Sequence, residues 1–260
     1  MLFVLPTVGE LYVAAVLLLF LAQRTMIYPA PKGPTAVPPG FEQVMLRTTD
    51  GLSLAAAWRP AVPGKRTVLF FHGNGDSLSG AAFATRQLVD AGYGMLLADY
   101  RGYSGNPGKP SEQGLILDGE AALGFLKAKG IEPESLVLMG ASLGTGVATQ
   151  LASRHRPAAL VLVSPFTSLP DVGAVAMPWA PVRALMLDRF DSLDAMPRVS
   201  APVLVLHARD DRLIPFAQAE ALAGAARNGR FLPFDRHGHQ LQYEAEAQDA
   251  VVGWLASQGL

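Results

Sequence analysis

The sequence predicts an α/β fold in which a mostly parallel central sheet is flanked by helices. Two observations support this class. From residue 41 onward, short apolar runs alternate with helix-length amphipathic segments, and several of the runs are rich in Val and Leu, which is typical of strands buried on both faces. Such alternation predicts parallel strands joined by crossover helices. We therefore expect one large domain over residues 41–260.

The expected strands divide into an opening hairpin and a parallel series. Phe41–Thr48 and Leu52–Arg59 flank Thr49-Asp50-Gly51, a turn sequence that predicts an antiparallel hairpin. Six further runs of buried-strand length follow at Thr67–Phe71, Met95–Tyr100, Leu136–Gly140, Leu160–Val163, Val203–His207 and Arg230–Phe234. The expected helices are Ala81–Ala91, Ser111–Lys129, Leu143–Arg154, Phe216–Ala226 and Gln240–Ser257.

One interval breaks this alternation. Residues 165–201 contain several prolines around an amphipathic fragment at Val182–Leu187, so they do not read as a simple crossover. We interpret them as a small cap or lid that passes over the sheet. Because ligands in such sheets bind outside the carboxyl ends of the strands, a cap there would cover a binding site.

The chain begins with an apolar segment. The unbroken run Leu11–Ala22 reaches the roughly 20 residues of a membrane-spanning helix only together with Glu10 and the residues before it. No Lys or Arg precedes Arg24, so the basic start of a secretory signal peptide is missing. We expect residues 1–24 to form an uncleaved anchor helix. The alternative is a helix packed on the domain or on a second copy of the chain.

The residues that follow the anchor bear on orientation. Arg24 and Lys32 come after the apolar run and no basic residue precedes it, which by the positive-inside rule favours a cytoplasmic catalytic domain. Residues 25–40 are rich in Pro and Gly and predict a semi-rigid spacer.

Composition excludes several functional classes. Hydrophobic residues make up 50% of the chain and charged residues 17%, which excludes intrinsic disorder and points to a membrane contact. The 21 basic and 22 acidic residues nearly cancel, so no electrostatic basis for a nucleic-acid partner exists. The absence of cysteine excludes disulfides, thiolate zinc sites, iron–sulfur clusters and a cysteine nucleophile.

The sharpest functional motif is Gly140-Ala-Ser-Leu-Gly144, which directly follows an expected strand and precedes an expected helix. In this context the glycines permit a sharp turn, Ser142 projects its hydroxyl above the sheet, and the helix N-terminus offers backbone N–H groups. We expect Ser142 to be a nucleophile. The alternative is that Ser142 only caps the helix.

A serine nucleophile needs a base, and the base needs an orienting acid. Of the five histidines, His155 lies at a helix end, while His72 and His207 end strands and are typical of hydrogen-bonded supports. His237 and His239 follow the last strand, in a loop that can reach over the sheet, and they are the candidate bases. A metal site at this His-x-His pair is the alternative, although no third ligand lies nearby in the sequence.

Asp210 and Asp211 are the candidate acids. They follow the strand expected at Val203–His207 and so lie at the carboxyl edge of the sheet, and the order Ser, Asp, His along the chain agrees with a nucleophile at a strand-to-helix turn. Asp99 lies outside that order. Three carboxylates of the cap are interpreted as solvated or capping groups: Asp188, Asp191 and Asp194.

Acyl transfer also requires N–H donors for the developing oxyanion. Phe71-His-Gly-Asn-Gly75 follows an expected strand, and its glycines let the backbone turn beneath a substrate carbonyl. We assign the two donors to the backbone N–H groups of Asn74 and Leu143. The alternative is a tight strand-to-helix turn without a function.

These motifs together resemble the α/β-hydrolase superfamily, and within it the membrane-anchored α/β-hydrolase-domain serine hydrolases that include protein depalmitoylases. The resemblance covers nearly the whole chain through the segments Gln23–Pro29, Phe71–Gly75, Asp99–Tyr103, Gly108–Gly114, Gly140–Gly144, Ser164–Ser168, Asp188–Ser192 and Gly238-His239. It implies the α/β-hydrolase fold, with Ser142 as nucleophile, Asp211 as acid and His239 as base. Asp210 and His237 become neighbours that tune the site.

The chain departs from the family pattern at two places. Ala208 follows the strand-end His207 where the family usually has Gly, and Gln240-Leu241 follow His239 where the family often has Asn-Asp. Neither departure removes Ser142, Asp211 or His239. With Gln240 in place of the usual residue, however, the family pattern does not say which groups contact His239.

We therefore expect a serine hydrolase that cleaves carboxylic esters of small-molecule or lipid-derived substrates through an acyl-enzyme, with no metal and no organic cofactor. Apolar side chains of the cap are the candidate substrate pocket, although at helical spacing they also fit a core: Phe166, Met177, Trp179, Leu185, Met186 and Leu187. An acyl-protein thioesterase and an amidase or peptidase are the alternative activities. A membrane-tethered scaffold is the non-enzymatic alternative. Such a scaffold would be expected to have lost a residue of the triad, and none is missing from this chain.

Overall fold

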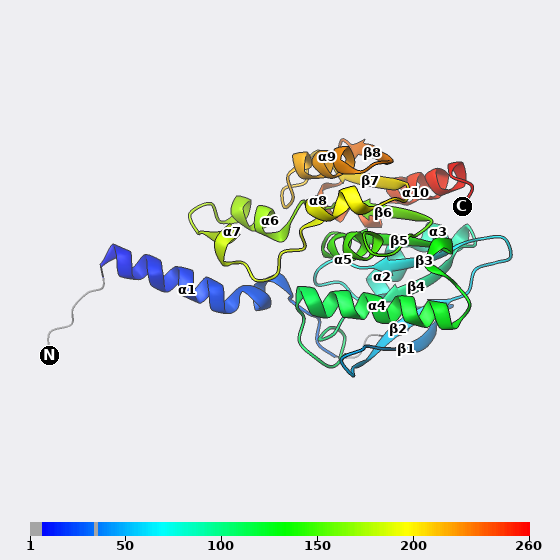
Figure 1. The fold of residues 1–260 in the computed structure, drawn as a ribbon, viewed down its shortest axis with the longest axis horizontal. Coiled ribbons are helices and arrows are strands. Elements are labelled where there is room, and N and C mark those ends of the chain that lie inside the picture. Colours follow the sequence, from blue (N-terminus) through cyan, green and yellow to red (C-terminus); the bar gives the residue numbers. More distant parts are fainter. Residues whose placement is uncertain (1–6, 34–35) are drawn as a thin grey trace.

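An eight-stranded sheet forms the centre of the molecule, in the order β1-β2-β4-β3-β5-β6-β7-β8 (Figure 1). The computed structural model describes residues 7–33 and 36–260, so part of the predicted anchor (1–6) and of the predicted spacer (34–35) lies outside the described residues. The strands are β1 (Glu42–Arg47), β2 (Ser53–Arg59), β3 (Thr67–Phe71), β4 (Gly94–Ala98), β5 (Leu136–Ala141), β6 (Ala159–Val163), β7 (Val203–Ala208) and β8 (Gly229–Phe234).

The pairing of the strands agrees with the sequence pattern. β1 and β2 form the predicted antiparallel hairpin, and β2 also runs antiparallel to β4. Every other neighbouring pair is parallel. Each predicted strand is present, and its ends differ from the prediction by no more than about two residues, the usual uncertainty of element boundaries. The predicted mostly parallel sheet is therefore confirmed.

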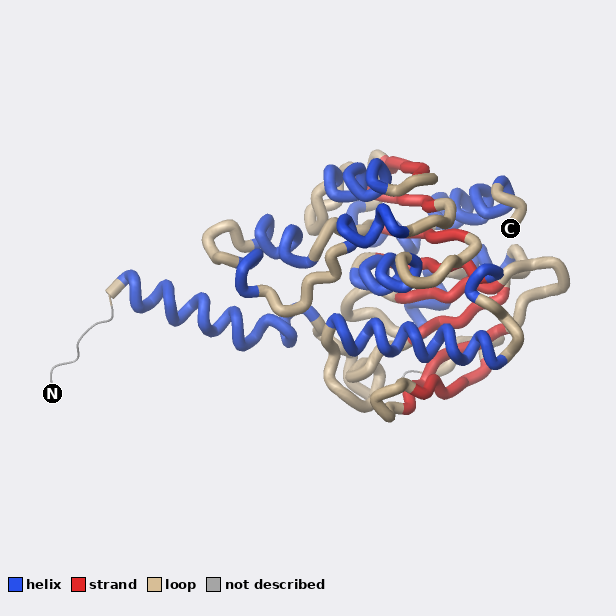
Figure 2. Tube along the Cα trace, viewed as in Figure 1, coloured by secondary structure: helices blue, strands red, loops and turns tan. Residues whose placement is uncertain are grey.

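Helices cover both faces of the sheet (Figures 1 and 2). α4 (Glu112–Ala128), α5 (Leu143–Ala152) and α9 (Phe216–Ala225) pack on one face, and α2 (Leu78–Ala84), α3 (Arg86–Asp90) and α10 (Ala245–Ser257) pack on the other. The core divides in the same way because successive strand side chains point to opposite faces. In β3, Leu69 and Phe71 join the first hydrophobic cluster, and Val68 and Phe70 join the second.

Two helices differ from the sequence-based expectation. The helix expected at Ala81–Ala91 is broken into α2 and α3 at Thr85, whose hydroxyl donates to the Ala81 carbonyl at 2.9 Å and competes with the helical backbone. The last helix begins only at Ala245, because residues Gly238–Tyr243 form a 3₁₀ segment, η3. A further 3₁₀ turn, η1 (Pro133–Ser135), precedes β5.

The segment between β6 and β7 begins beyond the end of the sheet, beside the N-terminal helix, and then returns to pack against α5 and α9 (Figure 1). It contains α6 (Leu169–Ala176), α7 (Val182–Leu185), α8 (Ser192–Ala195) and the 3₁₀ turn η2 (Met196–Arg198). The sequence pattern indicated only the fragment around α7. Pro170 concealed α6 in the sequence, yet a proline in the first turn fits a helix, because the N–H that it lacks would have no intrahelical partner there.

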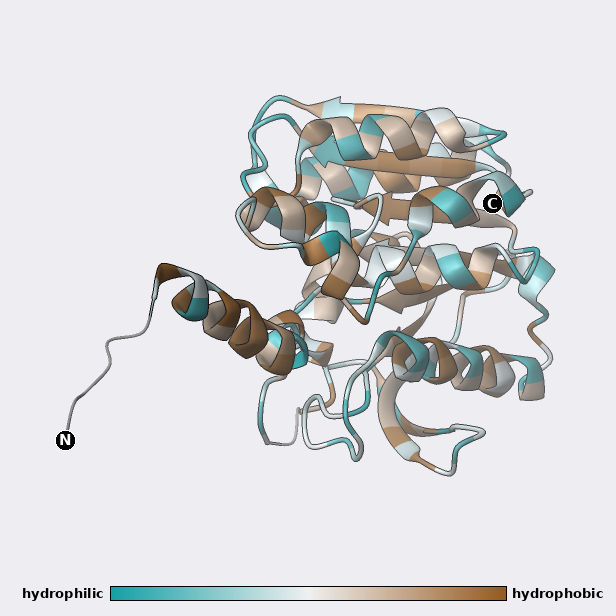
Figure 3. Ribbon diagram, turned by 60° about the vertical axis from the view of Figure 1, so that its left-hand side comes forward, coloured by the Kyte–Doolittle hydropathy of each residue, from teal (hydrophilic) through white to brown (hydrophobic). Residues whose placement is uncertain are grey.

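The N-terminal helix α1 (Val8–Ile27) projects from the domain and passes alongside α6 and α7 (Figures 1 and 3). Thr7 caps it, and Glu10 completes the capping box. The helix continues past Arg24 to Ile27, and the described residues between Ile27 and β1 are non-helical. By length and composition α1 is able to cross a membrane.

The interpretation of Asp188 as a solvated or capping carboxylate is wrong. Asp188 is 2% exposed, and its two oxygens accept hydrogen bonds from the Arg24 guanidinium of α1 at 2.9 and 3.0 Å. The sequence pattern missed this because the partners are far apart in the chain and meet only through tertiary packing. Asp191 and Asp194 pair with Arg189 and Arg198 at the surface.

Candidate active site

Ser142 occupies a strained turn between β5 and α5. Its φ and ψ are 47° and −117°, a conformation that non-glycine residues rarely adopt. The flanking glycines are required by close backbone approach, because a Cβ at Gly140 would overlap the Gly144 carbonyl and a Cβ at Gly144 would overlap the Phe71 carbonyl. The Ser142 hydroxyl makes no capping hydrogen bond to α5. The turn therefore leaves the hydroxyl available to another partner.

That partner is His239. The distance from His239 Nε2 to Ser142 Oγ is 2.8 Å, and the distance from His239 Nδ1 to Asp211 Oδ2 is also 2.8 Å. An imidazole protonated on Nδ1 donates to the carboxylate and leaves Nε2 to accept the serine proton. His239 lies in η3, and its carbonyl accepts a hydrogen bond from Ser164 Oγ at 3.2 Å, so the end of β6 holds this loop over the sheet.

Asp211 is held by the backbone of its own loop. Its Oδ1 accepts hydrogen bonds from the N–H groups of Leu213 and Ile214, at 2.8 and 3.0 Å. Burial raises the pKa of this carboxyl, but the hydrogen bonds from His239, Ile214 and Leu213 together lower it by more. The net pKa therefore lies below the usual value. Asp211 therefore presents a charged carboxylate to His239 at neutral pH.

The other histidines and Asp210 have different partners. His207 Nε2 contacts the Ile214 carbonyl at 3.0 Å, and burial lowers the pKa of this imidazole, so a neutral ring supports the Asp211 loop. Asp210 accepts a hydrogen bond from the Gly238 N–H at 2.8 Å and thereby ties the Asp loop to the His239 loop. His237 faces Glu244 and Glu246, each at 3.5 Å. The rings of His237 and His239 thus face different groups rather than one shared metal position.

Asn74 and Leu143 line one cavity together with Ser142. Among the residues that the structure describes, neither backbone N–H has a hydrogen-bond acceptor in the protein. Leu143 begins α5, where the first N–H groups have no intrahelical partner. Tyr103 Oη donates to Asn74 Oδ1 at 3.0 Å and orients this residue. Both backbone N–H groups thus lack a protein acceptor and belong to residues that line the Ser142 cavity, so their role as oxyanion donors stays a prediction.

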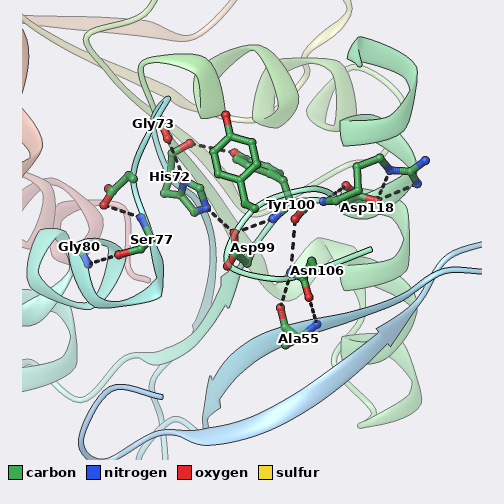
Figure 4. Close-up of polar contacts among 12 residues, drawn as sticks. Ala55, His72, Gly73, Ser77, Gly80, Asp99, Tyr100, Asn106 and Asp118 are labelled. Carbon is green, nitrogen blue, oxygen red and sulfur yellow. Dashed lines mark hydrogen bonds and ion pairs between the residues drawn. The ribbon is translucent and has the colours of Figure 1, made fainter. Parts of the chain in front are cut away.

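A buried His–Asp pair, His72 and Asp99, lies next to Gly73 (Figure 4). His72 Nε2 is 3.0 Å from Asp99 Oδ1, and His72 Nδ1 is 2.8 Å from the Gly73 carbonyl. Both ring nitrogens thus face acceptors, which only a protonated imidazole satisfies. Burial lowers the pKa of His72, but the hydrogen bond to Asp99 and its negative charge raise it, and the net pKa is raised. Tyr100 Oη also donates to the His72 carbonyl at 2.9 Å.

The cavity beside Ser142 has a volume of about 220 Å³ and a mostly apolar wall. Of the six predicted pocket residues, Phe166, Met177 and Met186 line it. Leu185 lines an adjoining groove instead. Trp179 and Leu187 line neither and are largely exposed. The sequence reasoning missed these lining residues: Met26, Ile27, Leu169, Val172, Gly173, Leu213 and Ile214.

The contribution of α1 to this cavity was not foreseen. Met26 and Ile27 fall in the range 25–40 that is predicted from the sequence as the spacer, yet they belong to α1 and line the cavity. The sequence feature that could have pointed to these two residues is the segment Gln23–Pro29, which is one of the segments that carry the family resemblance.

Comparison with known proteins identifies the class. Residues 63–193 match the family model described as serine aminopeptidase, S33. An uncharacterized protein of Mycobacterium tuberculosis is 39% identical over 90% of this chain and 88% of its own length. The chain belongs to this family of serine-hydrolase type, within the α/β-hydrolase superfamily.

Two further relatives refine the comparison. Human α/β-hydrolase domain-containing protein 17B is 34% identical over 70% of this chain, and the match covers 63% of that protein. A solved esterase from Pyrococcus furiosus superposes with a TM-score of 0.71 at 20% identity, over 89% of this chain and 98% of the esterase. The structural similarity confirms the predicted α/β-hydrolase fold.

Proposed function

We propose that this protein is a membrane-anchored serine hydrolase that cleaves carboxylic esters of apolar or lipid-derived acyl groups through an acyl-enzyme. The observation that carries the proposal is the hydrogen-bonded chain Ser142–His239–Asp211, with 2.8 Å at each link, beside an apolar cavity. A nucleophile within reach of a base, and a base oriented by an acid, is the arrangement that activates a serine.

In the acylation step, Ser142 Oγ attacks the ester carbonyl carbon while His239 Nε2 takes its proton. The C–O bond order of the carbonyl falls, and the negative oxygen accepts hydrogen bonds from the N–H groups of Asn74 and Leu143. The intermediate then expels the alcohol, which receives the proton from His239. Asp211 remains a carboxylate throughout and stabilises the imidazolium.

In the deacylation step, water replaces the alcohol. His239 takes a proton from the water molecule while the water oxygen attacks the carbonyl carbon of the acyl group on Ser142. The ester bond to Oγ breaks, the proton returns to Oγ, and the carboxylic acid leaves. A thioester follows the same steps with a thiol as the leaving group, so the triad alone does not distinguish esters from thioesters.

The apolar wall of the cavity supports an acyl group as the part of the substrate bound beside Ser142. Met177, Met186 and Phe166 provide flexible or flat apolar surface, and each buried methylene of a ligand contributes about 0.8 kcal/mol. The exposed apolar length of α1 supports the membrane anchor. Arg24 in the last turn of α1 and Lys32 after the helix support a cytoplasmic catalytic domain.

An aminopeptidase is the second candidate, because the matching family model carries that description. An aminopeptidase must bind the free ammonium group of its substrate close to the scissile bond. Among the described residues that line the Ser142 cavity there is no Asp or Glu, and Asp211 is occupied by His239. This wall favours an uncharged acyl group.

Hydrolysis of 4-nitrophenyl esters from acetate to palmitate by the full-length protein in detergent tests the proposal, with Ser142→Ala as the matched variant. We expect hydrolysis by the wild type and a loss of at least about 10³-fold in the variant, because the alanine has no nucleophilic oxygen. Equal rates in the two proteins would refute the proposal. Hydrolysis of aminoacyl 4-nitroanilides, without hydrolysis of the esters, would favour the aminopeptidase.

A further inference from the structure

The N-terminal helix α1 has two apolar faces with different surroundings. Val13, Leu17, Leu18 and Leu21 are each more than half exposed and point away from the domain. Val16, Leu19 and Phe20 instead face the cap and form one wall of a groove, at the i, i+3, i+4 spacing of a single helical face. Their side of α1 is therefore part of the folded domain, while the opposite side is free to contact lipid.

The opposite wall of the groove is formed by Ala180, Val182 and Leu185 of the cap. Among the described residues of the groove, only Gln23 is polar, and its side chain is engaged in hydrogen bonds. Its Oε1 accepts from the Leu187 N–H at 2.8 Å, and its Nε2 donates to the Phe20 carbonyl at 2.8 Å. The groove thus offers a ligand a hydrocarbon surface and few hydrogen bonds.

The groove adjoins the cavity at Ser142. Four residues line both spaces, Met26 and Ile27 from α1 and Met177 and Met186 from the cap. From Val16 to Ile27 the helix rises by roughly 16 Å at about 1.5 Å per residue. A zigzag chain with C–C bonds of about 1.52 Å advances roughly 1.25 Å per carbon, so about a dozen carbons span this length.

The width of the groove is fixed by polar contacts between α1 and the cap. Arg24 forms two hydrogen bonds with the buried Asp188, and Gln23 accepts one from Leu187. Near the other end of the helix, Tyr12 Oη donates to the Trp179 carbonyl at 3.2 Å, and the two rings pack edge to face. These contacts hold α1 beside the cap at both ends.

We propose that the groove between α1 and the cap is a binding site for the fatty acyl chain of the substrate, which enters from the surrounding bilayer with its carbonyl at Ser142. This inference rests on the proposed function and adds to it the source of the substrate and the part of the chain that binds it. The anchor helix is then a wall of the substrate site as well as a tether. The bilayer is the source because the helix that forms this wall is the segment long and apolar enough to lie in it.

The test uses the full-length protein in phosphatidylcholine nanodiscs with 4-nitrophenyl butyrate and palmitate. Leu19→Trp fills the groove, and Leu18→Trp places the same ring on the exposed face of the same helix. Each methylene of the acyl chain that the tryptophan displaces from the groove should weaken binding roughly fourfold. We expect Leu19→Trp to lower kcat/KM for palmitate at least about tenfold relative to butyrate, and Leu18→Trp to change that ratio by less than about twofold.

Different outcomes separate the two proposals. An unchanged palmitate-to-butyrate ratio in Leu19→Trp, with both activities dependent on Ser142, would overturn the acyl site and leave the hydrolase intact. The absence of Ser142-dependent hydrolysis of either ester would overturn the proposed function, and the acyl site with it. Palmitoyl glycerol and an S-palmitoyl peptide, presented in the same nanodiscs, distinguish a lipid from an acylated protein as the source of the chain.

A second measurement covers the case in which the tryptophan variant does not fold. A long-chain alkyl fluorophosphonate with a terminal diazirine reacts with wild-type protein, as Ser142 Oγ bonds to phosphorus, fluoride leaves and the proton passes to His239. Irradiation should then crosslink the chain end to the Val16–Phe20 segment of α1. Crosslinks only to other parts of the domain, or only to a second copy of the protein, would contradict the proposed path.

Discussion

Ser142 owes its position to an unfavourable backbone conformation. A non-glycine residue at φ 47° costs about 1–3 kcal/mol, and the surrounding contacts must hold it. The Ser142 N–H donates to the Val163 carbonyl at 2.9 Å, and Thr145 Oγ1 donates to the Ser142 carbonyl at 2.6 Å. Both backbone groups are thus occupied, and only the hydroxyl remains for His239.

Asp211→Asn should abolish turnover with little effect on folding. The amide oxygen still accepts the Leu213 and Ile214 hydrogen bonds, but the amide nitrogen now faces His239 Nδ1 and selects the tautomer with its proton on Nε2. His239 Nε2 then already carries a proton and cannot accept the one from Ser142. We expect kcat to fall by at least about 10³-fold with a nearly unchanged unfolding midpoint, measured by ester hydrolysis and circular dichroism. Retention of wild-type kcat would exclude Asp211 as the orienting acid.

The helix α1 and the cap depend on one another through the Arg24–Asp188 pair. The Asp188 side chain is 3% exposed and that of Arg24 is 51% exposed. Removing Arg24 therefore leaves a buried carboxylate without its partner, whereas removing both charges does not.

Arg24→Met should loosen the cap, and Asp188→Asn in the same chain should restore much of the loss. Because water reaches Arg24, we expect a cost of about 1–3 kcal/mol for the single variant, less than for a fully buried pair. Hydrogen exchange of the α7 amides measures it. Arg198→Met breaks an exposed pair with Asp194 and serves as the control, with an expected cost below about 0.5 kcal/mol. Equal exchange in Arg24→Met and wild type would contradict the coupling.

The turn after β4 supports the Asn74 loop through Tyr100 and Tyr103, and Arg101 anchors this turn. Its guanidinium contacts the buried Asp118 at 2.8 Å and forms two hydrogen bonds with Asp50, at 2.7 and 3.1 Å. The hydrogen bonds from Arg101 lower the pKa of Asp50 from 3.8 to about 2.

This shift predicts a pH-dependent effect of Asp50→Asn. A carboxyl whose pKa is lower in the folded state stabilises the fold above pH 3.8, and the contribution is lost as the pH falls toward about 2. Because Asp50 is 40% exposed, we expect the variant to be less stable by no more than about 1 kcal/mol at pH 6. Chemical unfolding at pH 6, 4 and 2.5 should show this difference shrinking on acidification. A constant or growing difference would contradict the assignment.

The whole molecule combines a folded hydrolase domain with an apolar helix that extends beyond it (Figure 3). The chain has no cysteine, so a single introduced thiol reports the side of the membrane without a background signal. Val8 lies at the free end of α1 and Gln258 near the C-terminus, and both are exposed.

We predict that Gln258→Cys reacts with a membrane-impermeant maleimide only after intact cells are permeabilised, because the positive-inside rule keeps the segment after Arg24 in the cytoplasm. Val8→Cys, at the other end of the helix, should react without permeabilisation. Labelling of Gln258→Cys in intact cells would place the domain on the outer side. Protection of both thiols before permeabilisation would argue against a helix that crosses the membrane.

The strands and the Ser142 turn could be predicted because their signals are local. Apolar runs of strand length, a hairpin turn at Asp50-Gly51 and glycines around Ser142 each act within a few residues. The cap was predicted less well. α6 has a proline in its first turn, which suggests a loop, and Trp179 and Leu187 do not line the cavity although Met177 and Met186 of the same segment do.

The sequence by itself determined the fold class, the order of the strands along the chain and the residue types at the carboxyl edge of the sheet. The family resemblance already implied His239 rather than His237 as the base. Only the tertiary structure decided that Asp188 is buried against Arg24 and that Met26 and Ile27 line the cavity. The reason is physical. Periodicity and turn chemistry act between neighbours in the chain, whereas burial and hydrogen-bond partners depend on segments that are distant in sequence and meet only when the sheet, the cap and α1 pack together.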